Sequence, residues 1–478
     1  MRADPQAALD RLAETVRHDL ACIDYPPRPW VHRRQHERGP VYDAVIVGAG
    51  QSGLGAAFGL MREHIENILV LDENPEGKEG PWVTYARMVT LRTPKYLVGP
   101  ELGVPSLSFR AWWEAQFGSA AWDALDKIAR EEWMRYLRWY RATLGIPVMN
   151  DCRVDLVEPI EPQLFRLAVS GAGAPRDGVV LARKVVLATG IQGGGEWHVP
   201  RFIAQSLPRS RYAHASGPID YAAMRGLSIG ILGGGASAFD NAQFGLRLGV
   251  GEMHVFLRRN DLQRVNPIRH IENAGFLGQF AALDDAMKYR AIAHFLSLSQ
   301  PPTNDTFRRA MAYPGFHLHL GAPWQKVEDT GDGILVTTPQ GRHRFDFVVL
   351  STGLLTDAKL RPELRLVAPD IALWKDRYAP PEGTANALVD QHPYLGPHFE
   401  LTPKSPEAAP RLYGLFALNY SALASLGLSA SALSGMKYAL PRLVAGVARQ
   451  LFLDDRDIIM RDYFAYCDEE FVESWPAS

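Results

Sequence analysis

The chain has 478 residues, and its 51 Lys and Arg against 53 Asp and Glu give a formal net charge of -2. This balance disfavours nucleic acid or an anionic membrane as the main partner, and the length suggests two or three packed units. Three widely spaced cysteines exclude a CxxC redox pair and a thiolate zinc cluster. The chain also lacks a signal-peptide core and any apolar run near the roughly 18 residues of a membrane span, so we expect a cytoplasmic protein.

The N-terminal arm, residues 1–40, contains a helix-like apolar repeat over 6–23 and then a Pro-rich, basic connector. We expect this arm to pack on the main body or on a second subunit, so a homodimer is one assembly to consider. A part in the chemistry is the less favoured interpretation.

A strand, a glycine turn and a helix of small residues follow in YDAVIVGAGQSGLGAAFGL, which begins at Tyr42. Gly48, Gly50 and Gly53 form the pattern GxGxxG. The first glycine permits a tight turn, the second lets the backbone approach a pyrophosphate, and the third lets the helix lie close to the sheet. The next strand, in NILVLDEN, ends at Asp72, which is spaced to accept hydrogen bonds from a ribose. This unit predicts a dinucleotide site.

Two further segments complete the first half of the chain. Residues 111–141 have a helical pattern rich in aromatic side chains, which we interpret as core packing rather than a substrate cage. The segment RKVVLATG, at 183–190, is typical of a buried strand that ends in a tight turn.

A second strand–glycine–helix unit begins in LSIGILGGGASAFDNAQFGL, where Gly233, Gly235 and Ala238 give the variant GxGxxA. Arg258 and Arg259 follow the next strand, at the place where an acid would hold a 2′-hydroxyl. A guanidinium can grip a 2′-phosphate bidentately, so this site predicts NADPH. The alternative is a pair of solvated surface arginines. Two such units in one chain imply two nucleotides.

A helical insertion over residues 261–313 interrupts the second unit. Its large side chains could roof a substrate pocket or form a satellite core, and the sequence leaves both alternatives open. These side chains are Phe276, Phe280, Met287, Tyr289 and Phe295.

The remaining polar candidates have structural interpretations. His317 and His319 alternate as in a strand and share one face, and without a third ligand we predict structural histidines and no metal site. Asp240 and Asn241 begin the second helix, where capping or interdomain hydrogen bonding is favoured over catalysis. The tail, residues 411–451, is expected to end in a long helix of small residues.

These motifs together resemble the flavin-containing monooxygenases and their Baeyer–Villiger relatives. The likeness covers about residues 41–450 and rests on GAGQSGL with VLDEN, on ATG at 188–190, on GGGASA with LRR, and on STG at 351–353. It implies an α/β fold with two Rossmann-like domains, a helical insertion and an N-terminal arm. The FAD domain would comprise residues 41–200 and 346–478, and the NADPH domain residues 201–345.

The resemblance also assigns residues to the two cofactors. The Thr-Gly turns would join the domains, Trp82 would lie beside the flavin, and Asn419 would belong to a segment that closes over FAD. The cofactor-binding residues implied are Gly48, Gly50, Ser52, Gly53, Asp72, Glu73, Trp82, Val154, Thr189, Gly190, Gly233, Gly235, Ser237, Ala238, Arg258, Arg259, Thr352, Gly353 and Asn419.

Two departures from the family pattern bear on catalysis. The fingerprint FxGxxxH keeps only His214, in SLPRSRYAHASG, and we expect that histidine to fix the linker between domains. The family's flavin-proximal Asn has no counterpart, and LRTPKYL offers Arg92 and Lys95 instead. We take Arg92, Lys95 and His214 as the candidate catalytic residues.

The resemblance implies that NADPH reduces FAD and that reduced flavin forms a C4a peroxide with dioxygen. The peroxide would oxygenate a small organic substrate, either an amine, a sulfide or a ketone. A cation beside the flavin would favour the peroxy anion, and so attack on ketones. The alternatives are a non-oxygenating NADPH-dependent flavin oxidoreductase and a dinucleotide-binding redox sensor without NADPH turnover.

Overall fold

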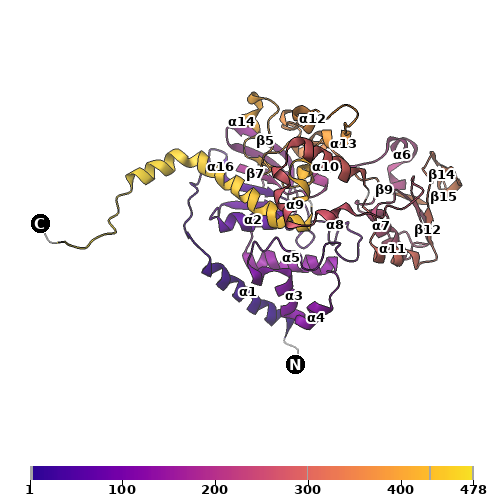
Figure 1. The fold of residues 1–478 in the computed structure, drawn as a ribbon, viewed down its shortest axis with the longest axis horizontal. Helices are drawn as coiled ribbons and strands as arrows, with labels where there is room; N and C mark the ends of the chain where they lie inside the picture. The colour runs from indigo at the N-terminus through magenta and orange to yellow at the C-terminus, as the bar shows by residue number, and fades with distance from the viewer. Residues whose placement is uncertain (1–3, 299, 430–431, 476–478) are drawn as a thin grey trace.

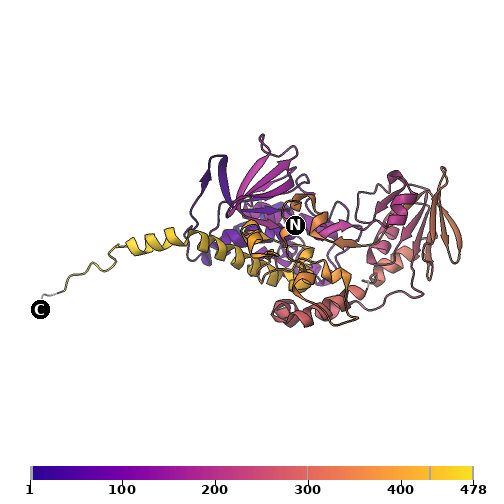
Figure 2. The ribbon, with the colours of Figure 1, turned by 90° about the horizontal axis from the view of Figure 1, so that it is seen from above.

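The computed structural model describes residues 4–298, 300–429 and 432–475. Positions 430–431 of the expected flavin-closing segment and position 299 of the insertion lie outside these ranges. Two α/β units lie side by side, the N-terminal helix packs beneath the first unit, and the last helix extends away from the body (Figure 1). Figure 2 shows the two units from above, each with its own sheet.

The first unit is built on a sheet of eight strands among the described residues, in the order β4-β3-β2-β7-β6-β5, with β1 on β2 and β18 on β7. Its central strands run parallel, while β5, β6 and β7 form an antiparallel meander. The central strands are apolar on both faces, as expected of a covered parallel sheet. The strand bounds are β1 Gln35–His36, β2 Gly39–Val47, β3 Ile68–Leu71, β4 Val148–Met149, β5 Arg153–Glu161, β6 Leu164–Ser170, β7 Val179–Leu187 and β18 Leu415–Phe416.

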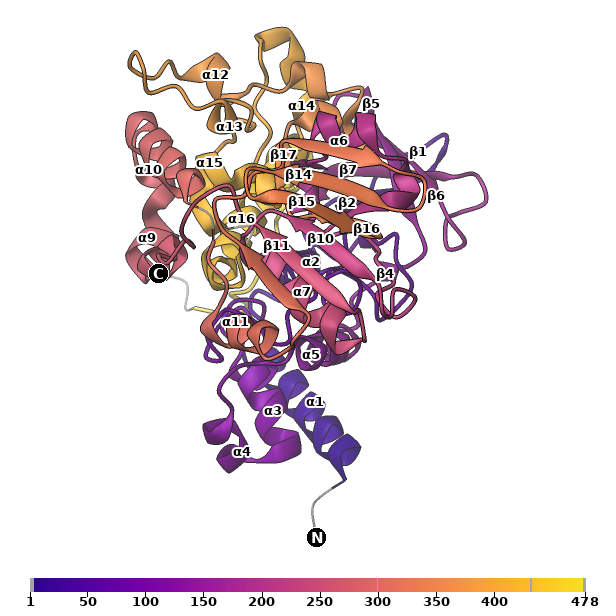
Figure 3. The same cartoon turned by 90° about the vertical axis from the view of Figure 1, so that its right-hand side faces the viewer.

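The second unit has a parallel sheet in the order β12-β11-β10-β16-β9 and a separate antiparallel sheet, β13-β14-β15. Helix α7 covers one face of the parallel sheet, and the antiparallel sheet covers the other (Figure 3). Strands β17 and β8 pair as a short linker between the units. The bounds are β8 Gly195–Trp197, β9 Tyr212–His214, β10 Ser228–Leu232, β11 Glu252–Phe256, β12 Phe316–His319, β13 Lys326–Asp329, β14 Ile334–Thr338, β15 Gly341–Phe345, β16 Phe347–Leu350 and β17 Leu354–Thr356.

The helices fill the connections between these strands. Helix α2 connects β2 to β3, and α7 connects β10 to β11. None of the helices in the described ranges combines the length and the apolar character needed to cross a membrane. Their bounds are α1 Pro5–Cys22, α2 Gln51–Arg62, α3 Phe109–Phe117, α4 Ser119–Ala124, α5 Arg130–Leu144, α6 Arg201–Ser206, α7 Ala236–Arg247, α8 Pro267–Ile271, α9 Ala274–Gln279, α10 Asp285–Ser297, α11 Asn304–Met311, α12 Trp374–Arg377, α13 Ala387–Asp390, α14 Ala409–Leu412, α15 Leu423–Leu426 and α16 Met436–Ala465.

The aromatic segment and the insertion both pack as cores. Trp112 and Trp133 are buried in the main core beneath the first sheet, which confirms the packing interpretation of residues 111–141. In the insertion, Phe280 and Tyr289 are buried in a separate cluster with Trp374 from the C-terminal region. The satellite-core alternative is therefore confirmed for these side chains.

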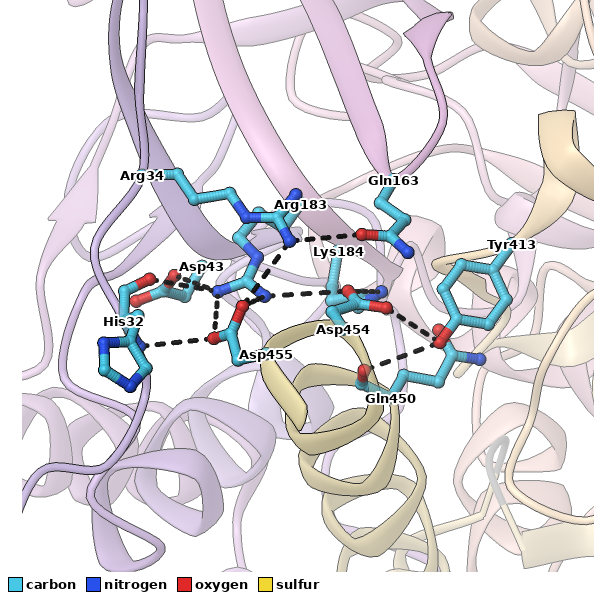
Figure 4. A network of polar contacts seen from close by, with 10 residues as sticks. All are labelled: His32, Arg34, Asp43, Gln163, Arg183, Lys184, Tyr413, Gln450, Asp454 and Asp455. Atoms are coloured by element: carbon cyan, nitrogen blue, oxygen red, sulfur yellow. Dashed lines mark hydrogen bonds and ion pairs between the residues drawn. The ribbon is translucent and has the colours of Figure 1, made fainter. Parts of the chain in front are cut away.

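The C-terminal helix is longer than expected. Helix α16 continues to Ala465, well beyond residue 451, and its second half is charged rather than small. The reason is a buried network on that half: Asp455 bonds both terminal nitrogens of Arg183 on β7, at 3.0 and 2.7 Å (Figure 4). Asp454 Oδ2 lies 2.7 Å from Lys184 Nζ, and burial lowers the pKa of Lys184 to about 8 while Asp454 opposes that shift.

The N-terminal arm packs on the main body. Helix α1 begins with Asp4 capping Gln6, and Val16 is fully buried in the main core. The connector reaches the network of α16, where the backbone N–H of His32 donates to Asp455 Oδ2 at 3.2 Å (Figure 4). The arm thus contacts the last helix through this network.

Candidate active site

The first glycine turn is built as the sequence predicts. Gly48 has φ +104°, and a Cβ there would lie 2.5 Å from the carbonyl oxygen of Ala188. A Cβ on Gly53 would lie 1.8 Å from the carbonyl oxygen of Gly48. Both positions therefore require glycine for turn geometry and helix–strand packing.

Gly50 has a different role, because it caps α2 with φ -68°, where any residue can fit. A Cβ there would meet only the Cα of Gly80, at 3.8 Å, so the backbones of these two glycines lie close together and form a cradle free of Cβ atoms. The N–H groups of the first turn of α2, including that of Ser52, point to this side of the turn. The indole Nε1 of Trp82 is buried there and lacks a hydrogen-bond partner among the described residues. This cradle fits the pyrophosphate of FAD.

The two acids at the end of β3 differ in their contacts, because Asp72 already has hydrogen-bond partners and Glu73 is exposed. The Asp72 carboxylate is buried and accepts from the N–H of Ala49 at 2.7 Å and from both nitrogens of Asn74 at 2.9 and 3.0 Å. It therefore holds the glycine turn in place. Glu73 is exposed at the end of β3, close enough for its charge to help burial raise the pKa of Tyr85 to about 12.

Four other predicted positions belong to the first unit. Val154 on β5 is buried in the core, and the N–H of Cys152, two residues earlier, donates to the Asp72 carbonyl. Asn419 Nδ2 donates to Thr189 Oγ1 at 3.1 Å, and Gly190, at φ +66°, bridges to the same asparagine. The first Thr-Gly turn is thus tied to the C-terminal segment.

The second glycine turn repeats the first. Gly233 has φ +111°, and a Cβ there would lie 2.3 Å from the carbonyl oxygen of Ser351. Gly235 caps α7, and Ala238 is fully buried against the sheet. Ser237 is exposed on the first turn.

A backbone contact distinguishes the second cradle from the first. The N–H of Ala236, at the start of α7, donates to the Gln300 carbonyl at 3.0 Å. A Cβ on Gly235 would meet that same oxygen, at 3.8 Å. The Gln300 carbonyl therefore occupies one of the N–H groups through which such a turn binds a pyrophosphate.

The two arginines after β11 are both exposed but differ in their contacts. Arg259 donates to Gln263 Oε1 at 3.4 Å and to the Ser297 carbonyl at 3.3 Å. Arg258 makes no hydrogen bond or ion pair within the described ranges. Arg258 is therefore the guanidinium that is better placed to receive a 2′-phosphate.

Replacing Arg258 and Arg259 together with alanine is expected to weaken NADPH binding by roughly tenfold to a hundredfold for each charge-assisted bond lost. NADH binding should change little, because NADH has no 2′-phosphate. The measurement is anaerobic flavin reduction at increasing NADPH or NADH, with the exposed Arg264→Ala as the control. An equal loss for both coenzymes would show that the phosphate binds elsewhere.

His214 connects to the second Thr-Gly turn rather than to a reacting group. Its ring is buried and stacks on Trp197, with centroids 4.8 Å apart, and its Nδ1 accepts from the N–H of Ser216. The Thr352 hydroxyl donates to the His198 carbonyl, and the His198 N–H donates to the Gly353 carbonyl at 2.9 Å. These contacts fix the linker strands β8 and β17.

Burial lowers the pKa of His214 from 6.5 to about 4, although the Gly353 carbonyl opposes the shift. The unfolded chain therefore binds this proton more tightly, and the free energy of unfolding should fall as the pH drops from about 6.5 to 4, by up to roughly 3 kcal/mol. Urea unfolding at pH 7 and pH 5 measures this loss. His214→Asn should reduce the pH dependence and the exposed His270→Asn should not; equal slopes in both variants would contradict this account.

Arg92 is an ion-pair residue at the junction between the two units. Its guanidinium contacts the carboxylate of Asp240 on α7, and it donates to Gln300 Oε1 at 3.2 Å. Burial raises the pKa of Asp240, and Arg92 opposes that shift. The interdomain interpretation is confirmed for Asp240, whose partner Arg92 comes from the first unit. Asn241 instead accepts a hydrogen bond within the second unit, from the Tyr221 hydroxyl at 2.8 Å.

The predicted catalytic cation is therefore not supported. Arg92 is neutralised by a carboxylate, so it is not a free charge that could favour a peroxy anion. Lys95 points elsewhere: its Nζ donates to the carbonyls of Trp122 at 2.7 Å and Asp123 at 3.3 Å, beside the Trp122 ring. The resemblance suggested these roles, because LRTPKYL stands where the family has its flavin-proximal Asn, whereas the side chain of Lys95 is directed at α4.

The sequence analysis did not identify a cluster of arginines at the junction between the two units. Arg87 and Arg130 from the first unit and Arg247 from α7 all place their guanidinium carbons within 5.0–6.0 Å of the Phe244 ring. Arg87 is 6% exposed and bonds only carbonyl oxygens among the described residues. The three are far apart in sequence, so no local motif marks them.

Comparisons with known proteins match most of the chain. A family model described as FAD-NAD(P)-binding matches residues 45–192, and one described as L-lysine 6-monooxygenase/L-ornithine 5-monooxygenase matches residues 121–267. A curated protein from Xanthomonas campestris pathovar campestris, an FAD-dependent urate hydroxylase, is 59% identical over 470 residues, which are 98% of each chain.

Solved structures share the fold at low identity. The ornithine hydroxylase from Pseudomonas aeruginosa has a TM-score of 0.65 and 17% identity over 86% of this chain and 100% of its own. The ornithine N-hydroxylase from Kutzneria sp. 744, whose structure is described with reduced FAD, NADP⁺ and L-ornithine, has a TM-score of 0.64 and 18% identity over 86% and 100%.

Proposed function

The chain belongs to the family of flavoprotein monooxygenases that includes the FAD-dependent urate hydroxylase of Xanthomonas campestris, and from this premise we propose that its substrate is urate or a closely related oxopurine. The observation that carries the proposal is the 59% identity over 98% of both chains. The amines, sulfides and ketones considered from sequence become the competing substrates.

The protein is an FAD- and NADPH-dependent monooxygenase that acts on a small molecule with dioxygen. FAD, when bound and reduced by NADPH, supplies the electrons that activate dioxygen for transfer of one oxygen atom. The chain itself binds both nucleotides, orients them across the junction and excludes water from it.

For the allocation of the cofactors, we take FAD to lie on the first turn, with its pyrophosphate against the backbone of Gly50 and Gly80 and its ribose at Glu73. NADPH lies on the second turn, with its 2′-phosphate at Arg258. This allocation follows the cradle of the first turn and the unpaired guanidinium after β11. It divides the chain at about residues 200 and 345, as the sequence suggests.

The charge at the junction favours an anionic substrate. Urate is a planar anion at neutral pH, whereas the side-chain amines of lysine and ornithine are cationic. Arg87, Arg130 and Arg247 gather around Phe244, and the acid that pairs with them among the described residues is Glu131, 2.7 Å from Arg130. A net positive field attracts urate and repels an ammonium group.

Steady-state turnover tests the substrate. We expect urate to stimulate NADPH oxidation by the FAD-loaded protein, with urate consumed in step with NADPH and little hydrogen peroxide released. L-Ornithine and L-lysine should give only the slow background rate. Stimulation by an amine and none by urate would overturn the proposal and favour N-hydroxylation.

A further inference from the structure

Three histidines from different strands meet on the face of the parallel sheet opposite α7. His254 lies on β11, His319 on the edge strand β12, and His343 on β15 of the antiparallel sheet. One ring nitrogen of each lies within 4.8 Å of the others. Strands β11 and β15 lie at the end of the molecule that faces the viewer in Figure 3. The antiparallel sheet with β15 covers one face of the parallel sheet, and α7, which follows the second glycine turn, covers the other face.

The three histidine rings lie close to one another. His254 Nδ1 lies 3.0 Å from His319 Nε2, and the centroids of His319 and His343 are 4.8 Å apart. The Nε2 of His343 is buried and has no hydrogen-bond partner among the described residues. Burial lowers the pKa of His254, and that of His319 to about 4, with their histidine neighbours adding to both shifts.

A carboxylate orients one of these rings. The other nitrogen of His254, Nε2, lies 3.3 Å from Glu252 Oε2. An N–H on Nε2 that donates to Glu252 leaves the lone pair of Nδ1 directed at His319. A carboxylate behind a histidine is the usual outer partner of a metal-ligating imidazole, because it fixes the tautomer and the ring orientation.

We propose that His254 Nδ1, His319 Nε2 and a ring nitrogen of His343 bind one divalent transition-metal ion, with Zn²⁺ the best fit. Three imidazoles suit Zn²⁺, Ni²⁺ or Cu²⁺ and not Ca²⁺ or Mg²⁺, which require oxygen ligands. Zn–N bonds of about 2.0–2.1 Å put tetrahedral ligand atoms about 3.3 Å apart, near the 3.0 Å found for His254 and His319. His343 completes the set, with a ring nitrogen within 4.8 Å of the other two.

Metal binding replaces the hydrogen bond between His254 and His319 with two metal–nitrogen bonds, and no group is oxidised or reduced. The ion replaces the proton that His254 and His319 share, and His319 then carries its N–H on Nδ1. Because the ligands come from β11, β12 and β15, the ion cross-links the parallel and antiparallel sheets of the second unit. This role lies outside oxygen transfer and does not depend on which substrate the enzyme uses.

Titration of the tag-free, FAD-loaded enzyme with ZnCl₂, against a chromophoric zinc chelator, tests the site. The wild-type protein should bind one Zn²⁺ per chain and unfold at a higher temperature with Zn²⁺ than without. His319→Ala and His343→Ala should each weaken binding by roughly a hundredfold or more. Glu252→Gln, which alters only the orienting carboxylate, should weaken it by about tenfold to a hundredfold.

Two histidines outside the ligand set serve as matched controls. His317 stacks on His254 at 4.2 Å, and His294 is exposed on α10; alanine at either should leave Zn²⁺ affinity unchanged. Retained FAD and unchanged circular dichroism verify that each variant is folded. Equal affinity in wild type and His319→Ala/His343→Ala overturns the site. Loss in His317→Ala with none in His343→Ala overturns this ligand set in favour of Glu252, His254 and His317.

Discussion

Gly50→Val is expected to give a folded protein that purifies without FAD and has no NADPH oxidase or monooxygenase activity. The backbone of Gly50 has φ -68°, so valine causes no backbone strain. Its side chain would cover the backbone surface formed by Gly50 and Gly80, where the Cβ alone already lies 3.8 Å from the Cα of Gly80. The pyrophosphate then has no access to the N-terminus of α2. The flavin-to-protein absorbance ratio measures the loss.

The matched control is the same substitution in the second turn. Gly235→Val should keep FAD and its yellow colour but lose reduction of the flavin by NADPH, because it blocks only the second cradle. Reduction by dithionite should remain. A Gly50→Val protein that retains a full complement of FAD would contradict the placement of the pyrophosphate.

Asp455→Ala is expected to lower the free energy of unfolding by about 3–5 kcal/mol, because it leaves a buried guanidinium without its main partner. Arg183 is 0% exposed and donates two hydrogen bonds to the Asp455 carboxylate, at 3.0 and 2.7 Å. The carboxylate of Asp43, 3.2 Å away, remains as its nearest acid. Urea unfolding, followed by tryptophan fluorescence, measures the change.

Asp457 on the same helix provides the control, since its side chain is 93% exposed and pairs only with exposed Arg456. Asp457→Ala should change the free energy of unfolding by no more than about 0.5 kcal/mol. If the two variants unfold alike, the network of Figure 4 does not hold α16 in place.

Local patterns predicted the nucleotide-binding framework well. The glycine turns, the strands around them and the buried helices follow from spacing over about 30 residues, and the structure places Gly48 and Gly233 as that spacing requires. The spacing pointed to Asp72 as the ribose acid, but it could not show which of the adjacent Asp72 and Glu73 has a free carboxylate. Only the folded turn shows that Ala49 and Asn74 occupy Asp72.

Contacts between distant segments escaped the sequence. Arg92 and Lys95 stand where a catalytic cation seemed plausible, yet their partners, Asp240 and the end of α4, are 148 and 27 residues away. His317 and His319 had no third ligand in sequence, whereas the pairing of β11 with β12 and the packing of β15 bring His254 and His343 beside them.

The most direct test of the central claim is to supply ¹⁸O₂ with NADPH and urate to the FAD-loaded enzyme and to analyse the product by mass spectrometry. The account predicts one ¹⁸O atom in the product derived from urate, about one NADPH oxidised per labelled molecule, and no product from the Gly50→Val variant. An unlabelled product, or NADPH consumed with only hydrogen peroxide formed, would contradict it.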